Sequence, residues 1–104
     1  MARAISNTIA DDNAVTETLD GGPIVEIKIT ETGGSHNLYV HVPVIHGTFD
    51  SGNPQDSAVL IGAGEAEFFA CPDSNITDVI LKNASAGQTP GYRIEVTTGV
   101  FVAE

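Results

Sequence analysis

The sequence has few of the residues that would indicate a disulfide-stabilised, nucleic-acid-binding or membrane protein. Its 104 residues include one cysteine, no tryptophan and only 4 lysines and arginines, against 14 aspartates and glutamates. A single cysteine excludes an intrachain disulfide. The lack of a basic patch argues against direct contact with nucleic acid phosphates. No apolar run approaches the roughly 18 residues that span a membrane, and Met1–Ser6 has no signal-peptide character. We therefore expect cytoplasmic synthesis without membrane association.

The composition is nevertheless that of a folded domain. Hydrophobic residues make up 41% of the chain, which argues against global disorder. A chain of 104 residues suits one domain that buries a core without disulfides. The formal net charge is −10 and is spread along the chain rather than gathered in a tail. Such a surface favours solubility, or docking on a basic partner.

Two segments in which apolar and polar residues alternate give the strongest structural signal. They are Ile24–Thr30 and Leu38–Val44, and Gly33-Gly34 lies between them. Alternation with β-branched residues on either side of a Gly-Gly loop predicts an antiparallel β-hairpin with one buried face. The residues expected on that face are Val25, Ile27, Ile29, Leu38, Val40, Val42 and Val44.

Similar short segments continue to the C-terminus. Gly62–Gly64 separates two of them and predicts a second hairpin, and Gly99 suits a bulge. Tyr92, and one of Phe68 and Phe69, are expected in the core. The predicted strands after residue 57 are 58–61, 66–70, 76–81, 92–97 and 100–102.

About seven or eight short strands with frequent turns predict an all-β fold. We expect a small antiparallel β-sandwich, jelly-roll-like or immunoglobulin-like, although the tryptophan typical of true immunoglobulin domains is absent. Residues 20–104 are expected to form this single domain. Residues 1–19 are predicted to be either an N-terminal arm or short strands. Because few lysines protect the edge strands, edge pairing between subunits is a natural way to complete the sheets.

Three histidines at five-residue intervals invite a metal-site hypothesis, which strand geometry opposes. His41 projects to the opposite face from His36 and His46 if all three lie on one strand. We therefore predict no metal site there. Cys71 follows apolar residues and is expected to be an inert thiol. No nucleophile and base, and no carboxylate pair, forms a convincing catalytic set, so we predict no catalytic residues, no cofactor and no enzymatic activity.

An interaction surface is the more promising site. Tyr39 and His41 face away from the apolar stripe of their segment, and Ile45 follows closely. In a two-layer sandwich this face meets solvent, so these three residues predict an apolar-aromatic interface patch. The other interpretation is that an adjoining loop covers them.

Taken as a whole, the chain resembles the small, acidic, all-β decoration or cement proteins of tailed bacteriophage heads. The resemblance lies in the Met1-Ala-Arg-Ala4 start, the Gly-Gly and Gly-Asn-Pro turns and the terminal segment Val100–Glu104. It implies a structural virion protein that binds the major capsid protein on the outer capsid surface, often as a homotrimer. The N-terminal segment, with Ile5 and Ile9, is then the first candidate for an anchoring arm.

The alternative is a ligand-binding β-sandwich module. Asp50–Asp56 offers carboxylates and amide groups that would suit calcium, although it lacks the ligand spacing of the helix-loop-helix calcium site. Together with Gly62–Glu65 it would hold calcium or a carbohydrate. A third, weaker hypothesis is a small jelly-roll enzyme that uses His36, His41 and a carboxylate.

Overall fold

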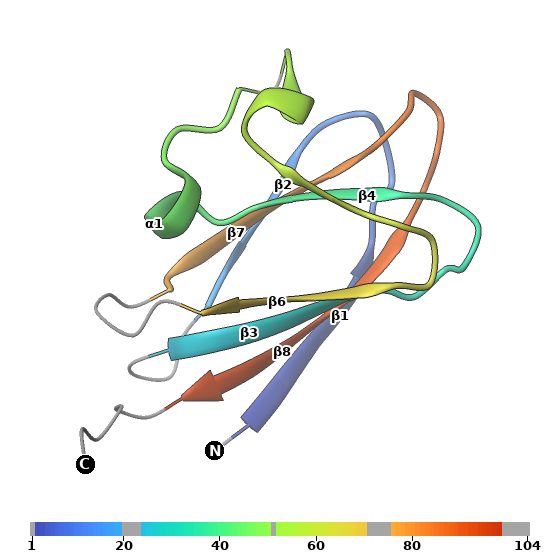
Figure 1. Ribbon diagram of the computed structural model, residues 1–104. Helices are drawn as coiled ribbons and strands as arrows, with labels where there is room; N and C mark the ends of the chain where they lie inside the picture. Colours follow the sequence, from blue (N-terminus) through green and yellow to red (C-terminus); the bar gives the residue numbers. More distant parts are fainter. Residues whose placement is uncertain (1, 20–23, 51, 71–75, 99–104) are drawn as a thin grey trace.

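The computed structural model describes residues 2–19, 24–50, 52–70 and 76–98 and shows two packed antiparallel sheets (Figure 1). The predictions for Cys71, Gly99 and 100–102 lie outside these residues. The elements are β1 (Ala2–Thr8), β2 (Val15–Thr18), β3 (Ile24–Glu31), β4 (Leu38–His41), α1 (Pro43–His46), the 3-10 helix η1 (Pro54–Asp56), β5 (Val59–Ile61), β6 (Ala66–Ala70), β7 (Asp78–Asn83) and β8 (Gly91–Thr98).

The strand order is that of a jelly roll. Sheet A has the order β1-β8-β3-β6 and sheet B the order β2-β7-β4-β5. The chain therefore crosses between the sheets after most strands, instead of running through neighbours in one sheet. This confirms the predicted antiparallel β-sandwich with eight short strands in the described residues, and of the two predicted types it is the jelly roll.

Both predicted hairpins are wrong. β3 pairs with β6 and β8, whereas β4 pairs with β5 and β7, so the turn at Gly33-Gly34 carries the chain from sheet A to sheet B. The Gly62–Gly64 turn likewise joins β5 of sheet B to β6 of sheet A. An alternating pattern fixes which face of a strand is buried, but it does not identify the neighbouring strand.

The predicted strand Leu38–Val44 is also too long. β4 ends at His41, and Pro43 begins the short helix α1. Proline has no N–H to donate to a sheet and its fixed φ suits the first turn of a helix. Val44, expected in the core, is consequently 37% exposed.

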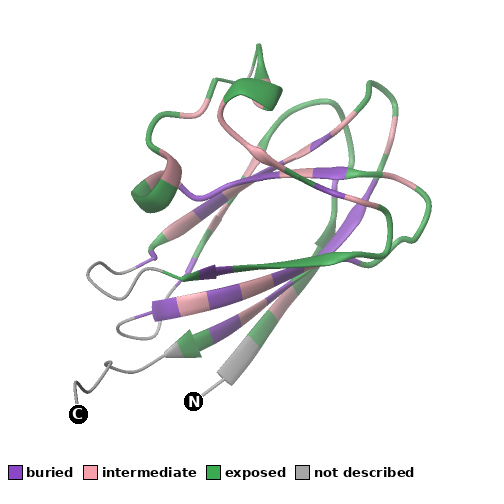
Figure 2. Ribbon diagram, viewed as in Figure 1, coloured by how far each residue is buried: buried purple, intermediate pink, exposed green. Residues whose placement is uncertain are grey.

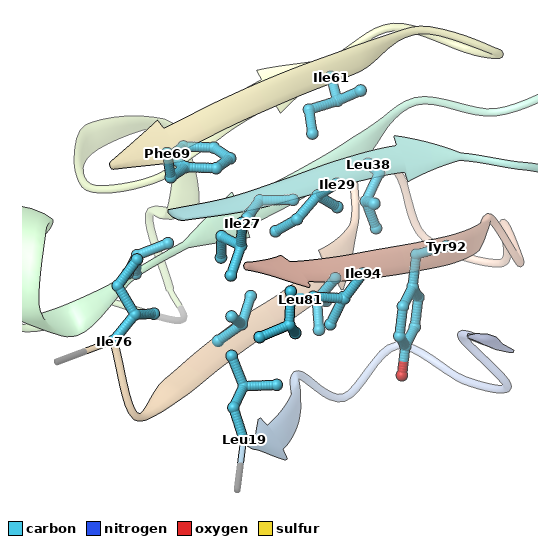
Figure 3. Packing of buried hydrophobic residues seen from close by; sticks show 14 of the residues in the cluster. Leu19, Ile27, Ile29, Leu38, Ile61, Phe69, Ile76, Leu81, Tyr92 and Ile94 are labelled. Carbon is cyan, nitrogen blue, oxygen red and sulfur yellow. The ribbon is translucent and has the colours of Figure 1, made fainter. Parts of the chain in front are cut away.

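The other core predictions are confirmed. Val25, Ile27 and Ile29 of β3 are buried, and so are Leu38, Val40 and Val42. Purple buried positions alternate with pink, partly exposed positions along β3 in Figure 2. Side chains from both sheets meet between the layers in Figure 3, among them Ile27 and Ile94 of sheet A and Leu81 of sheet B.

The N-terminal segment belongs to the sheets. β1 pairs with β8 along its whole length and β2 pairs with β7. Ile9 is fully buried in the core, and its N–H donates to the Pro90 carbonyl at 2.9 Å. Ile5 packs against the same core and is partly buried. Of the two predicted possibilities for residues 1–19, the described part forms the short strands β1 and β2. Ile9, directly after β1, is enclosed by the core, and Ile5 stays partly exposed.

The fold predicts a large effect for a charge at Val40, which is fully buried in sheet B. Val40→Asp buries a carboxylate without a partner. It should lower the free energy of unfolding by about 3–5 kcal/mol, which is enough to unfold a small domain. Urea denaturation followed by circular dichroism measures this. Thr16→Asp, on the exposed face of β2, is the matched control and should remain folded. A folded Val40→Asp protein would contradict the assigned core face.

Candidate interaction site

A buried carboxylate joins the loops at one end of the sandwich. Glu31, the last residue of β3, is 1% exposed. Its Oε1 accepts the N–H groups of Gly34 at 2.7 Å and Gly64 at 2.9 Å. Its Oε2 accepts those of Gly33 at 2.8 Å and Gly91 at 3.1 Å. One side chain therefore ties the β3–β4 turn, the β5–β6 turn and the start of β8 together.

Two of these donors depend on glycine. Gly34 has a φ of 77° and Gly64 a φ of 75°, in the left-handed region that other residues rarely adopt. In these conformations both N–H groups reach the same oxygen. Burial alone would raise the pKa of the Glu31 carboxyl, but the four backbone donors outweigh it and hold the pKa below its ordinary value of 4.5. Glu31 is therefore a buried carboxylate satisfied by hydrogen bonds rather than by a cation.

Two further side chains connect the loops at the same end. Asp12 Oδ1 accepts from Asn83 Nδ2 at 2.8 Å and from the Gly87 N–H at 2.7 Å. These two bonds, the backbone one first, lower the pKa of Asp12. Asn37 Oδ1 accepts the Ala63 N–H at 3.0 Å. The four connections at this end are thus each held by a hydrogen bond to a side-chain acceptor.

His41 occupies a second buried position, on the outer side of sheet B. Leu38 and Val40 point into the core, so Tyr39 and His41 point outward as predicted. His41 is nevertheless fully buried, because His46, Gly47, Phe49 and Ser57 of the connection to β5 lie against it. Its Nδ1 lies 2.7 Å from the Ser57 carbonyl oxygen and its Nε2 lies 2.7 Å from that of Gly47. The expectation that His41 meets solvent is wrong, and coverage by an adjoining loop describes it correctly.

Both contacts of His41 are with acceptors. Since a carbonyl oxygen only accepts, each contact is a hydrogen bond when the ring nitrogen that faces it carries the hydrogen. His41 thereby contacts the connection between β4 and β5 at two points, Gly47 and Ser57. Its ring packs 5.5 Å from that of His46 and 5.2 Å from that of Phe49, between centroids.

The histidine geometry corrects the argument from strand parity. His41 and His46 were expected on opposite faces, but α1 folds His46 back toward His41. His46 Nδ1 accepts the Val42 N–H at 3.0 Å. Burial first, and then the charge of His41, lower the pKa of His46. His36 lies apart in the 32–37 connection. No group of three or more potential metal-ligating residues occurs in the part of the chain that the structure describes.

The two loops of the ligand-binding alternative lie at opposite ends of β5. Asp50–Asp56 precedes β5, and Gly62–Glu65 follows it. The Asp50 carboxylate accepts from the backbone of Gly52 at 3.0 Å and from that of Asn53 at 3.3 Å. These bonds form a local turn that uses Asp50 Oδ1 within its own loop. The geometry therefore does not bring the two loops into one site.

Tyr39 lies in an exposed row across sheet B. Leu60 of β5 lies directly opposite it on one side and Lys82 of β7 on the other. Leu60 is 50% exposed and Tyr39 is partly exposed. Ile45, the third predicted interface residue, is 39% exposed on α1, beyond the end of β4. We call Leu60, Tyr39 and Lys82 the sheet B row.

A second exposed aromatic residue lies on the outer face of sheet A. Phe68 of β6 is 63% exposed, and the Lys28 ammonium lies 5.6 Å from the centre of its ring. Its neighbour Phe69 is buried, so of the two phenylalanines considered for the core, only Phe69 belongs there. Neither Leu60 nor Phe68 was predicted to be a surface residue. Ala66–Ala70 shows no clear alternation of apolar and polar residues, because the adjacent Phe68 and Phe69 are both apolar although they point to opposite faces.

The buried polar residues among those described are engaged in hydrogen bonds within the fold. The buried polar side chains Glu31, His41 and Asn83 make hydrogen bonds that hold loops in place. The Tyr92 hydroxyl donates to Glu17 at 2.6 Å, and burial together with this carboxylate raises the Tyr92 pKa. In the described part of the chain, no helix has the length and apolarity needed to cross a membrane.

Comparisons with known proteins place the fold but not the family. No protein-family model matches the chain, and no curated protein matches its sequence. A de novo designed double-stranded β-helix is similar with a TM-score of 0.61 and 16% identity, over 91% of this chain and 99% of that chain. PliG of Aeromonas hydrophila, a periplasmic lysozyme inhibitor of g-type lysozyme, is similar with a TM-score of 0.53 and 14% identity. That match covers 92% of this chain and 84% of PliG. At these identities the similarity is one of fold.

Replacing Glu31 should weaken the protein in a pH-dependent way. Glu31→Gln keeps the shape of the side chain but places an NH₂ group among N–H donors. We expect it to lower the free energy of unfolding by about 2–3 kcal/mol at neutral pH. Because the folded pKa is lowered, the stabilisation by the carboxylate is fully present above the unfolded value of 4.5. It is lost as the pH falls through the folded value. Thermal melts of wild type and variant should therefore converge in acid.

Glu67→Gln is the control for this experiment, because Glu67 is an exposed glutamate on β6. Its free energy of unfolding should lie within about 0.5 kcal/mol of the wild-type value at neutral pH. A Glu31→Gln protein as stable as this control would show that the Glu31 carboxylate does not hold the loops.

Proposed function

We propose that the chain is a non-enzymatic structural protein of a virus particle, which binds and stabilises the outer surface of a phage capsid. The observation that carries the proposal is the sheet B row, where the exposed Leu60 lies directly opposite the partly exposed Tyr39 on the outer face of sheet B. Contiguous apolar side chains of this kind mark interaction surfaces when polar groups surround them. Their partner would be the major capsid protein.

The loop geometry supports this proposal. A protein that binds only the assembled shell stabilises the shell by its own binding free energy. Loops already fixed by Glu31, Asp12 and Asn37 lose little conformational freedom on binding, so more of the contact energy remains available. The net charge of −10 favours a basic capsid surface. Three copies around a local threefold position, as the resemblance implies, would add avidity.

Co-sedimentation with capsids tests the proposal. Capsids assembled from the major capsid protein of the source phage should bind the purified chain to saturation and melt at a higher temperature with it. Tyr39→Ser should fold like wild type and weaken this binding by roughly tenfold or more. Ser6→Ala, an exposed change on β1 in the other sheet, is the control and should bind normally. Absence of any saturable binding would refute the capsid proposal.

A second candidate is suggested by the charge together with the fold. PliG, which has a similar fold, is an inhibitor of g-type lysozyme. An acidic chain of net charge −10 would be attracted to a basic enzyme in the same manner as to a basic capsid. We expect that an excess of the chain leaves cell-wall lysis by a g-type lysozyme unchanged. Stoichiometric inhibition of that lysis would favour the inhibitor candidate over the capsid protein.

The calcium or carbohydrate module is the weaker alternative. Its two loops lie at opposite ends of β5, so each would have to bind a ligand alone. A rise in the melting temperature on addition of calcium would be the sign of such a site.

A further inference from the structure

The outer edge of sheet A is formed by a strand suited to pairing with another strand. β6 is at the end of the order β1-β8-β3-β6, and among the described residues no strand pairs with its other side. Exposed green covers most of β6 in Figure 2, and Phe69 is its only buried residue. The strand contains no proline or lysine, two of the residues that usually protect edges.

The hydrogen-bond register shows which backbone groups face the free edge. β3 and β6 pair as Ile27 with Phe69 and Lys28 with Phe68, and the same register places Glu31 opposite Glu65. The Glu31 N–H donates to the Glu65 carbonyl at 2.9 Å. In an antiparallel ladder, bonded and non-bonded pairs alternate. Odd-numbered residues of β6 therefore bond to β3, and the backbone groups of Ala66, Phe68 and Ala70 point away from it.

The side chains of these same three residues lie on the outer face of sheet A. Phe69 points into the core, so Ala66, Phe68 and Ala70 point to the other side. The free edge thus combines unpaired backbone groups with three apolar side chains, arranged symmetrically about Phe68. The small alanines on both sides leave room for a large neighbour.

We propose that β6 pairs with β6 of a second copy of this chain, antiparallel about a two-fold axis at Phe68. In this register Phe68 lies opposite the second copy's Phe68, and Ala66 lies opposite Ala70. All these pairs are of the hydrogen-bonded type, because their backbone groups already face the edge. The two sheets A then form one continuous sheet. A two-fold contact needs a self-complementary strand, and β6 meets that requirement.

The charges favour this register over others. Glu67, the only charged residue on β6, lies opposite Phe69 of the second copy and not opposite the other Glu67. Each Lys28 ammonium remains beside its own Phe68 ring and borders the paired rings. The remaining opposition is the net charge of −10 on each copy, which salt screens. Self-association should therefore strengthen as the salt concentration rises.

Sedimentation velocity over a range of protein concentrations, at low and high salt, tests the pairing. The wild-type chain should form dimers, more readily at high salt. Ala66→Pro removes an N–H that faces only the free edge and should weaken dimerisation by roughly tenfold or more without breaking the ladder to β3. Phe68→Lys, which places two like charges opposite each other, should have a similar effect although it lowers the net negative charge.

Leu60→Lys is the matched control, because it replaces an exposed apolar residue with the same charge on sheet B. It should dimerise like wild type. Circular dichroism and thermal melts establish that each variant is folded. A monomer at every salt concentration, a trimer, or a dimer indifferent to both β6 substitutions would overturn the proposal. Capsid binding is tested separately through Tyr39 on sheet B, so failure of the β6 pairing and failure of the capsid proposal are distinguishable.

Discussion

The Glu31 carboxylate is the interaction on which the arrangement of the loops depends. A buried carboxylate is costly unless hydrogen bonds satisfy it, and here four backbone N–H groups do so. Those donors come from three places in the chain that become neighbours only when both sheets are formed. The charge therefore favours the complete jelly roll over partly assembled sheets. Its glycines are equally required, since Gly34 and Gly64 adopt positive φ to reach it.

The same principle, a buried polar side chain that fastens a connection, recurs on the outer side of sheet B. His41 contacts the connection between β4 and β5 at the carbonyl groups of Gly47 and Ser57. This covering divides the outer face into a protected part around His41 and an open part that contains Tyr39 and Leu60. The sheet B row proposed for binding therefore lies beside the connection that contacts His41. The outer edge of sheet A at Phe68 is a second, separate surface proposed for binding.

Much of the fold could be predicted because its signals are local. Alternation identified the inward residues of β3 and β4, and the number and spacing of turns indicated a sandwich of about seven or eight strands. The pairing of strands could not be predicted, since a hairpin and a crossing to the other sheet place the same residues inward. The candidate site was predicted only in part. Tyr39 was found from its outward direction, but Leu60 becomes its neighbour only through the pairing of β4 with β5.

The amino-acid sequence by itself determined the acidic surface, the all-β class and the faces of most strands, because net charge and alternation need no knowledge of distant residues. Only the tertiary structure decided which carboxylate is buried and which aromatic side chain is exposed. Glu31 is enclosed by the β3–β4 turn, the β5–β6 turn and the start of β8, whereas Glu67 lies exposed on the edge strand β6. The environment of a side chain depends on neighbours brought by other strands, and strand order is a property of the whole fold.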